Sequence, residues 1–174
     1  MKSSRKNRKE LQQKEKERIR DIFNQFDTDH SDSIDKNEFL AGMKSYFNLT
    51  DMSYENEFDH IFVTIFNLAD KASLFKKKDS KLDLKEFTKI IKSIPSEFNS
   101  ESFSTMSSRS IIGETLFNMI DDNGNGSISK SEFKKLCTYL NIDKKQSNSV
   151  FKEIDGDKSN SVGLQEFLNW FESF

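Results

Sequence analysis

Four segments of the chain repeat one pattern of apolar and polar positions. Each contains an apolar pair, an apolar residue three positions further on, an Asp, a polar stretch and finally Glu-Phe. The four segments read Ile22-Phe23…Phe26-Asp27…Glu38-Phe39, Ile65-Phe66…Ala69-Asp70…Glu86-Phe87, Leu116-Phe117…Ile120-Asp121…Glu132-Phe133 and Val150-Phe151…Ile154-Asp155…Glu166-Phe167. Apolar residues five, four and one positions before the Asp share one face of an α-helix. The pattern therefore predicts four helix–loop–helix units in an all-α fold.

The spacing within the units also predicts how they are organised. A first helix is expected over about residues 8–26, and Pro95 should end the exit helix of the second unit. We expect strand only as short pairing between loop centres, around Ile34, Leu82, Ile128 and Val162. The predicted division is a basic N-terminal helical extension (1–20), a first pair of units (21–95), a Ser- and Asn-rich linker (96–110) and a second pair (111–174). The two pairs form two lobes.

The polar stretches have the composition of calcium-binding loops. Calcium takes six to eight oxygen ligands, and a 12-residue loop supplies them from positions 1, 3, 5, 7, 9 and 12, with Gly at the sharp turn of position 6. Loop three, from Asp121 to Glu132, satisfies this pattern throughout, including Gly126 at the turn. Loops one and four place Asp32 and Asn160 at the turn, where both residue types tolerate a left-handed backbone at a cost of about 1 kcal/mol.

Three loops are therefore predicted to bind Ca²⁺, with Mg²⁺ as the competing ion. The expected ligands are Asp27, Asp29, Ser31, Ser33, Asp35 and Glu38 in loop one, Asp121, Asn123, Asn125, Ser127 and Glu132 in loop three, and Asp155, Asp157, Ser159, Ser161 and Glu166 in loop four. Position 9 of loop four is Gly163, so water is expected to supply that ligand.

Loop two departs from the other three. Its Asp70 and Glu86 are separated by 16 residues, whereas the equivalent separation is 11 in the other units. Counted back from Glu86, position 1 would be Phe75 and position 3 would be Lys77. Several lysines in this stretch oppose cation binding, so we predict that loop two pairs with loop one but stays empty.

These motifs resemble the EF-hand superfamily over nearly the whole chain. The lengthened second loop, the segment Leu68-Ala69-Asp70-Lys71, the basic N-terminal helix and Glu166-Phe167…Trp170-Phe171 are similar to the group of sarcoplasmic calcium-binding proteins and calflagins. That resemblance implies a compact body of two paired-loop lobes with a role in calcium storage or signalling. Calflagins are acylated on a Gly after Met1, whereas Lys2 stands here, which argues against that route to a membrane.

The charge is distributed unevenly along the chain. Residues 1–20 hold nine Lys/Arg and three Glu, which leaves 18 basic and 26 acidic residues for the rest of the chain. An acidic body suits a cation binder. The basic segment 2–20 has three interpretations: a solvated helix end, a contact with an anionic membrane or a protein target, and a contact with nucleic acid. Nucleic acid is disfavoured because no aromatic residues alternate with the charges.

Composition narrows the function further. No motif of a nucleophile with its base, a phosphate loop or a zinc site is present, so no enzyme activity is expected. The lone Cys137 is interpreted as a buried apolar residue, and it indicates a reducing compartment such as the cytoplasm, with the periphery of a membrane or of the cytoskeleton as alternatives. We expect a monomeric calcium sensor or signalling adaptor, and the alternative is a buffer without a regulated partner. The sequence leaves these two open, although 17 Phe against five Met favours rigid lobes over a promiscuous Met-rich groove.

Overall fold

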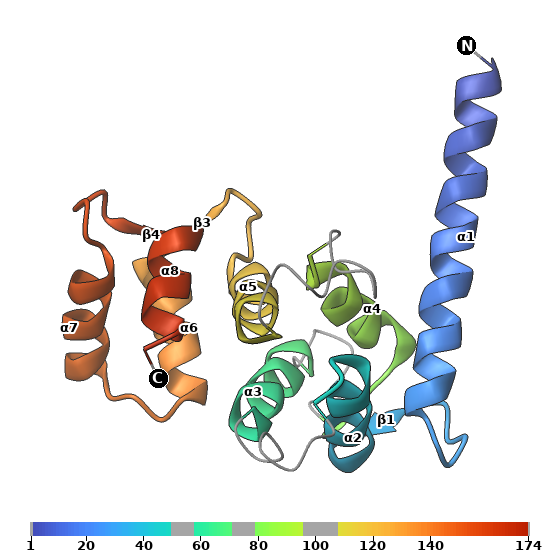
Figure 1. Ribbon diagram of the computed structural model, residues 1–174, viewed down its shortest axis with the longest axis horizontal. Coiled ribbons are helices and arrows are strands. Elements are labelled where there is room, and N and C mark those ends of the chain that lie inside the picture. The colour runs from blue at the N-terminus through green and yellow to red at the C-terminus, as the bar shows by residue number, and fades with distance from the viewer. Residues whose placement is uncertain (1, 50–57, 71–78, 96–107, 174) are drawn as a thin grey trace.

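The computed structural model describes residues 2–49, 58–70, 79–95 and 108–173 (Figure 1). These residues form eight helices and four short strands. The helices are α1 (Lys2–Phe26), α2 (Lys36–Tyr46), α3 (Asp59–Ala69), α4 (Leu84–Ser93), α5 (Ser108–Ile120), α6 (Lys130–Tyr139), α7 (Lys144–Ile154) and α8 (Leu164–Phe171). Each loop lies between an odd-numbered helix and the even-numbered helix that follows it, so the all-α fold of four helix–loop–helix units is confirmed.

The strands pair the loops two by two. β1 (Ile34–Asp35) is antiparallel to β2 (Lys81–Leu82), with Ile34 opposite Leu82. β3 (Ser127–Ser129) is antiparallel to β4 (Ser161–Gly163), with Ile128 opposite Val162. All four apolar residues are fully buried. The predicted pairing of loop centres is confirmed at these residues. Loop one pairs with loop two, and loop three pairs with loop four.

The exit helices begin at capping residues inside the loops. Asp35, Asp83 and Ser129 each accept a hydrogen bond from the backbone N–H of the Glu three residues later, and that Glu accepts one from the backbone N–H of the cap. This reciprocal arrangement satisfies two N–H groups that the helix itself cannot. The ninth residue of a loop therefore starts its exit helix, and the closing Glu is held at the third position of that helix.

α4 ends before the predicted linker 96–110, and α5 begins within it. α4 ends at Ser93 and Ile94 is extended, as expected before Pro95. α5 begins at Ser108, inside the stretch 96–110 that the sequence assigned to the linker, and residues 96–107 lie outside the described part of the chain. α5 packs against α3 and α4 of the first lobe and against α6 and α8 of the second, so it joins the two lobes (Figure 1).

α1 differs from the other helices because most of its length is exposed to solvent. It begins at Lys2, six residues before the start expected from the sequence. Every residue from Lys6 to Arg18 is exposed, and burial starts only at Ile19. Its last two turns dock on the first lobe, where Phe23 and Phe26 contact the ring of Phe87 at centroid distances of 5.6 and 4.9 Å. The basic half of α1 thus extends away from the body (Figure 1). Within the described residues, no helix is long and apolar enough to span a bilayer.

Gly42 permits the close approach of α2 to α1. A Cβ atom at this position would overlap the ring of Phe26, whose Cγ would lie 2.7 Å away. The ring cannot retreat because it is buried between Phe39 and Phe87. We expect Gly42→Ala to lower the free energy of unfolding by about 1–2 kcal/mol, since overpacking outweighs the helix-forming advantage of Ala.

Denaturant titration measures this effect, and the exposed neighbour Ala41 supplies the control. Ala41→Gly should cost about 1 kcal/mol through helix propensity alone. A gain in stability from Gly42→Ala would show that α1 and α2 do not pack this closely.

Candidate metal centres

Loop one gathers three carboxylates around a common point. Oxygens of Asp27, Asp29 and Glu38 all lie within 4.8 Å of one another. Glu38 Oε1 accepts hydrogen bonds from Thr28 N at 2.9 Å and from Asp29 N at 3.3 Å, and Oε2 accepts one from Asp35 N at 2.9 Å. Its carboxylate therefore spans the loop from the entering side to the exit helix. Ser31 Oγ donates to the Ser33 carbonyl at 3.0 Å, which brings the fifth and seventh positions together.

Loop four repeats this arrangement. Oxygens of Asp155, Asp157 and Glu166 lie within 4.8 Å of one another. Glu166 accepts from Gly156 N at 3.0 Å and from Gly163 N at 2.9 Å. Ser159 Oγ donates to the Ser161 carbonyl at 2.9 Å. Since Gly163 has no side chain, the ninth position of this loop offers the ion no side-chain oxygen.

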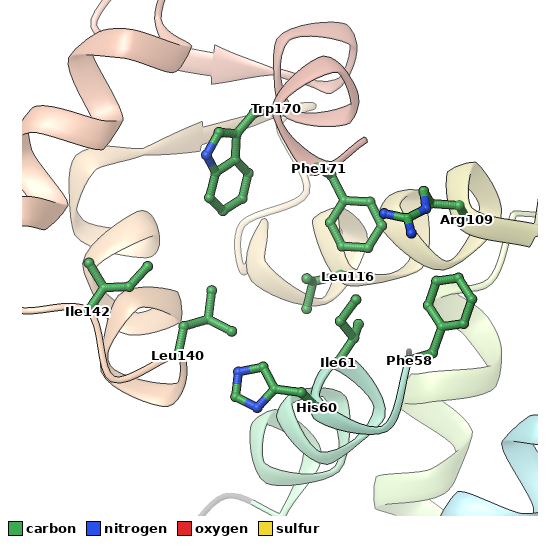
Figure 2. Close-up of a pocket in the computed structure, with 9 residues that line it drawn as sticks. All are labelled: Phe58, His60, Ile61, Arg109, Leu116, Leu140, Ile142, Trp170 and Phe171. Carbon is green, nitrogen blue, oxygen red and sulfur yellow. The ribbon is translucent and has the colours of Figure 1, made fainter. Parts of the chain in front are cut away.

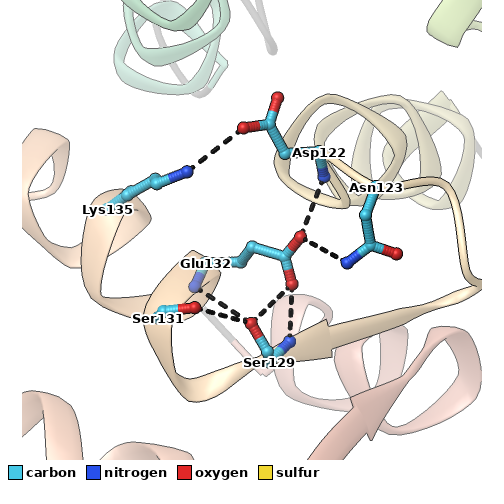
Figure 3. Close-up of polar contacts among 6 residues, drawn as sticks. All are labelled: Asp122, Asn123, Ser129, Ser131, Glu132 and Lys135. Carbon is cyan, nitrogen blue, oxygen red and sulfur yellow. Dashed lines mark hydrogen bonds and ion pairs between the residues drawn. The ribbon is translucent and has the colours of Figure 1, made fainter.

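Loop three combines two carboxylates with amide and hydroxyl oxygens. Glu132 Oε1 accepts from Asp122 N and from Asn123 Nδ2, both at 3.1 Å, and Oε2 accepts from Ser129 Oγ at 2.6 Å (Figure 3). Asn125 Oδ1 accepts from Ser127 N at 2.9 Å. Asn123 presents its amide nitrogen to Glu132, and rotation of the amide would present Oδ1, the atom that a cation requires.

The first residue of every loop holds the sharp turn through the same hydrogen bond. The Oδ2 atoms of Asp27, Asp121 and Asp155 accept from the backbone N–H of Asp32, Gly126 and Asn160 at 3.0, 2.8 and 3.1 Å. The three turn residues have φ angles of 58°, 80° and 66°. The left-handed conformation expected at Asp32 and Asn160 is therefore observed.

Loop two keeps this turn despite its extra length. Asp70 Oδ2 accepts from Ser80 N at 3.0 Å, and Ser80 has a φ of 62°. Asp70 is therefore the first residue of the loop, while Ser80 to Glu86 keep the ordinary sixth to twelfth positions. The additional residues fall within 71–78, outside the described part of the chain. Asp70 is 1% exposed, and its Oδ1 atom has no hydrogen-bond partner among the residues that the structure describes. No observation tests the expectation that this loop stays empty, so it remains a prediction.

Hydrogen bonds lower the pKa of one carboxylate in each predicted site. The Ser31 side chain lowers the pKa of Asp29, and the Ser159 backbone N–H lowers the pKa of Asp157. Burial opposes ionisation of Glu132, but hydrogen bonds from Ser129, Asp122 and Asn123 outweigh it and bring its pKa below the ordinary value. Ionised carboxylates this close repel one another unless a cation lies between them. A hard cation with oxygen ligands fits this donor set.

The structure adds roles that the ligand pattern alone did not show. Asp35, predicted as a ligand, also caps α2 by accepting from Asn37 N and Glu38 N. Thr28 and Ser129 donate hydroxyl hydrogen bonds to the closing glutamates of their loops, although neither was predicted to act there. The Ser129-x-x-Glu132 spacing is a capping-box signal that could have identified the second of them.

Models of known protein families match both lobes. The EF-hand domain pair matches residues 114–172, and the EF-hand domain matches residues 18–49. The chain belongs to the EF-hand family. Together with the acidic clusters of loops one and four, this membership identifies Ca²⁺ as the ion of the loops.

Similar EF-hand proteins occur in distant organisms. The chain is 27% identical over 160 residues to calcium-binding protein CML19 of Arabidopsis thaliana, which covers 91% of this chain and 83% of that protein. It is 40% identical to calcium-binding protein P of Dictyostelium discoideum over 57 residues, and the match spans 32% of this chain but only 12% of that protein.

Among solved structures, calcium-loaded apo-aequorin from Aequorea victoria is 21% identical and covers 87% of this chain and 84% of its own, with a TM-score of 0.39. The narrower likeness to sarcoplasmic calcium-binding proteins and calflagins stays a prediction.

Proposed function

We propose that this EF-hand protein is a calcium sensor that binds three ions reversibly and reports them through a change in its second lobe. The observation that carries the proposal is the burial of the residue that follows each closing glutamate. Phe39, Phe87, Phe133 and Phe167 occupy this position, and all four are fully buried. Any shift of a glutamate toward an ion is therefore transmitted at once to a ring in the centre of a lobe.

In the second lobe, two of these rings contact Trp170, which lies near the contact between the lobes. Trp170 packs against Phe133 at 5.9 Å and against Phe167 at 5.5 Å between ring centroids. Trp170 also lines a cavity of about 330 Å³. Figure 2 shows that the cavity walls come from α3, α5, the α6–α7 connection and α8. Filling of loops three and four would thus alter a mostly apolar cavity to which both lobes contribute.

The nature of this cavity supports a selective sensor. Its lining includes the rings of Phe58, Trp170 and Phe171. The two methionines of the described helices, Met43 and Met119, are both buried. Adaptable methionine surfaces are typical of EF-hand sensors with many targets. A rigid aromatic wall therefore favours one partner of fixed shape, while the alternative of a buffer requires that calcium leave this cavity unchanged.

No catalytic role is part of this proposal. Cys137, the strongest nucleophile of the sequence, is 2% exposed. Burial raises the pKa of its thiol, which disfavours the reactive thiolate. The carboxylates of the loops are already engaged by backbone N–H groups, as an EF-hand requires.

Trp170 fluorescence and a dye for apolar surface test the sensor proposal together. We expect calcium to change the Trp170 emission and to increase dye fluorescence. Trp170 lies four residues after Glu166 of loop four, and its contact with Phe133 couples it to loop three as well. Glu132→Gln and Glu166→Gln should therefore each remove about half of the emission change, because each removes the ligand that closes one of the two loops.

Glu38→Gln in loop one provides the matched control, because Phe39 lies in the other lobe and contacts Phe26 and Phe66. It should leave the Trp170 response nearly intact. If calcium binds without any increase in dye fluorescence, the protein is a buffer and the sensor proposal is wrong.

A further inference from the structure

A hollow of about 410 Å³ lies between α1 and α4 on the first lobe. Glu15, Lys16, Ile19 and Arg20 line it from α1, and Leu84, Lys85, Thr88 and Lys92 line it from α4. Four of these side chains are cationic and one is anionic. Ile19 is 2% exposed and gives the hollow an apolar floor. The sequence placed the basic surface on residues 2–20 alone, and the structure adds the lysines of α4.

The single carboxylate does not neutralise this site. Glu15 lies 3.9 Å from Lys92, and the two side chains are 48% and 56% exposed. An ion pair this long and this accessible to water is weak. Within the part of the chain that the structure describes, no carboxylate forms an ion pair with Lys16, Arg20 or Lys85. The hollow therefore keeps a net positive charge.

The cations of the hollow continue along both helices. Lys9, Lys16 and Arg20 are separated by seven and four residues, which places them on one face of α1. Lys85 and Lys92 are separated by seven residues on α4, and both line the hollow. A row of basic residues thus runs from the exposed half of α1 onto the body of the first lobe.

Among the described residues, the exposed half of α1 is supported only near its end, where Glu15 and Lys16 face α4. Its residues 6–18 are exposed, and its side chains are mostly polar on every face. Such a helix is marginally stable alone, because most helical stability in proteins comes from packing. A surface that pairs with its basic face would supply the missing stabilisation.

We propose that α1 and α4 together form a docking surface for an anionic membrane, in which the hollow accepts the phosphate of a lipid headgroup. Charge complementarity carries the choice of partner, since basic residues near a surface of anionic lipids are attracted to it. Nucleic acid is a poorer match because none of the described residues that line the hollow is aromatic and able to stack on a base. This docking is independent of the calcium proposal.

Sedimentation of the full chain with lipid vesicles tests the docking surface. Vesicles of phosphatidylcholine alone are compared with vesicles that also contain phosphatidylserine and a phosphoinositide. We expect tighter binding to the anionic vesicles by at least about tenfold, with a loss at high salt. The double variant Lys85→Glu/Lys92→Glu should weaken that binding by at least about tenfold, because it removes the α4 side of the hollow.

The matched control is Lys134→Glu/Lys145→Glu, which changes the charge equally at exposed positions of the second lobe. It should weaken binding by less than about threefold, since only the long-range charge changes. Circular dichroism and calcium stoichiometry confirm that each variant is folded.

Several results would overturn the proposal. Equal binding to neutral and anionic vesicles would exclude a charge-based site, and an equal loss in both double variants would show that net charge alone matters. Tighter binding to a DNA duplex than to anionic vesicles would assign the surface to nucleic acid. Binding of soluble inositol hexakisphosphate as tight as that of the vesicles would indicate a site for a free phosphate compound.

Discussion

Replacement of Glu132 by Gln is expected to reduce calcium binding from three ions per chain to two. Glu132 is 4% exposed and closes loop three with both carboxylate oxygens facing it. The amide keeps the shape and can still form the capping box, but it removes the negative charge and one of the two oxygens. Loss of a residue that only hydrogen-bonds to a metal ligand lowers metal affinity about 10- to 100-fold. Loss of Glu132, a direct ligand, should therefore lower the calcium affinity of loop three by more than about 100-fold. Isothermal titration calorimetry measures both stoichiometry and affinity.

Glu153→Gln is the matched control for this experiment. Glu153 is exposed on α7 and undergoes the same chemical change, so three ions should still bind. A wild-type stoichiometry of four would contradict the prediction that loop two is empty. Asp70→Asn would then identify the additional ion, because the buried Oδ1 of Asp70 lacks a partner within the described part of the loop. Three ions bound to Glu132→Gln would instead contradict the assignment of loop three.

Replacement of Phe87 by Ala is expected to lower the free energy of unfolding by about 3–5 kcal/mol. Phe87 is fully buried, and its ring contacts Phe23 and Phe26 of α1 with T-shaped geometry. The loss combines the transfer of a large apolar group with a cavity that α1 cannot fill. Since small domains are stable by only about 5–15 kcal/mol, this single change should be visible as a large shift in the denaturant midpoint.

Leu11→Ala is the control, because it truncates an apolar side chain in the exposed half of α1, away from the ring of Phe87. Leu11 is 70% exposed, so its truncation should change stability by less than about 0.5 kcal/mol. Amide hydrogen exchange adds a second measurement for Phe87→Ala, because α1 should lose protection before the second lobe does. Equal stability of Phe87→Ala and Leu11→Ala would show that α1 is not anchored through this ring.

The sequence by itself determined the features that depend on residues close together in the chain. The spacing of Asp121 and Glu132 predicted a loop whose first and last residues face each other, and the structure places Glu132 across it. Ile34 and Leu82 were predicted to lie opposite one another, and they do. These features were readable because a 12-residue loop, its cap and its flanking turns are stabilised by short-range hydrogen bonds.

Tertiary structure decided what depends on contacts between distant segments. Loop two can be counted forward from Asp70 or back from Glu86. The hydrogen bond from Ser80 N to Asp70 Oδ2 shows that Asp70 is the first position and that Ser80 to Glu86 are the sixth to twelfth. Trp170 is close in the chain only to loop four, and its packing on Phe133 connects it to loop three.

Residue spacing also could not predict that α5 joins the two lobes. Nor could it predict the hollow lined by both Lys16 and Lys92. Periodicity gives the apolar face of each helix but not its partner, because many pairings bury the same apolar area. The basic N-terminal segment was recognised from the chain alone. Only the packing of α1 against α4 places Lys16 and Arg20 beside Lys85 and Lys92.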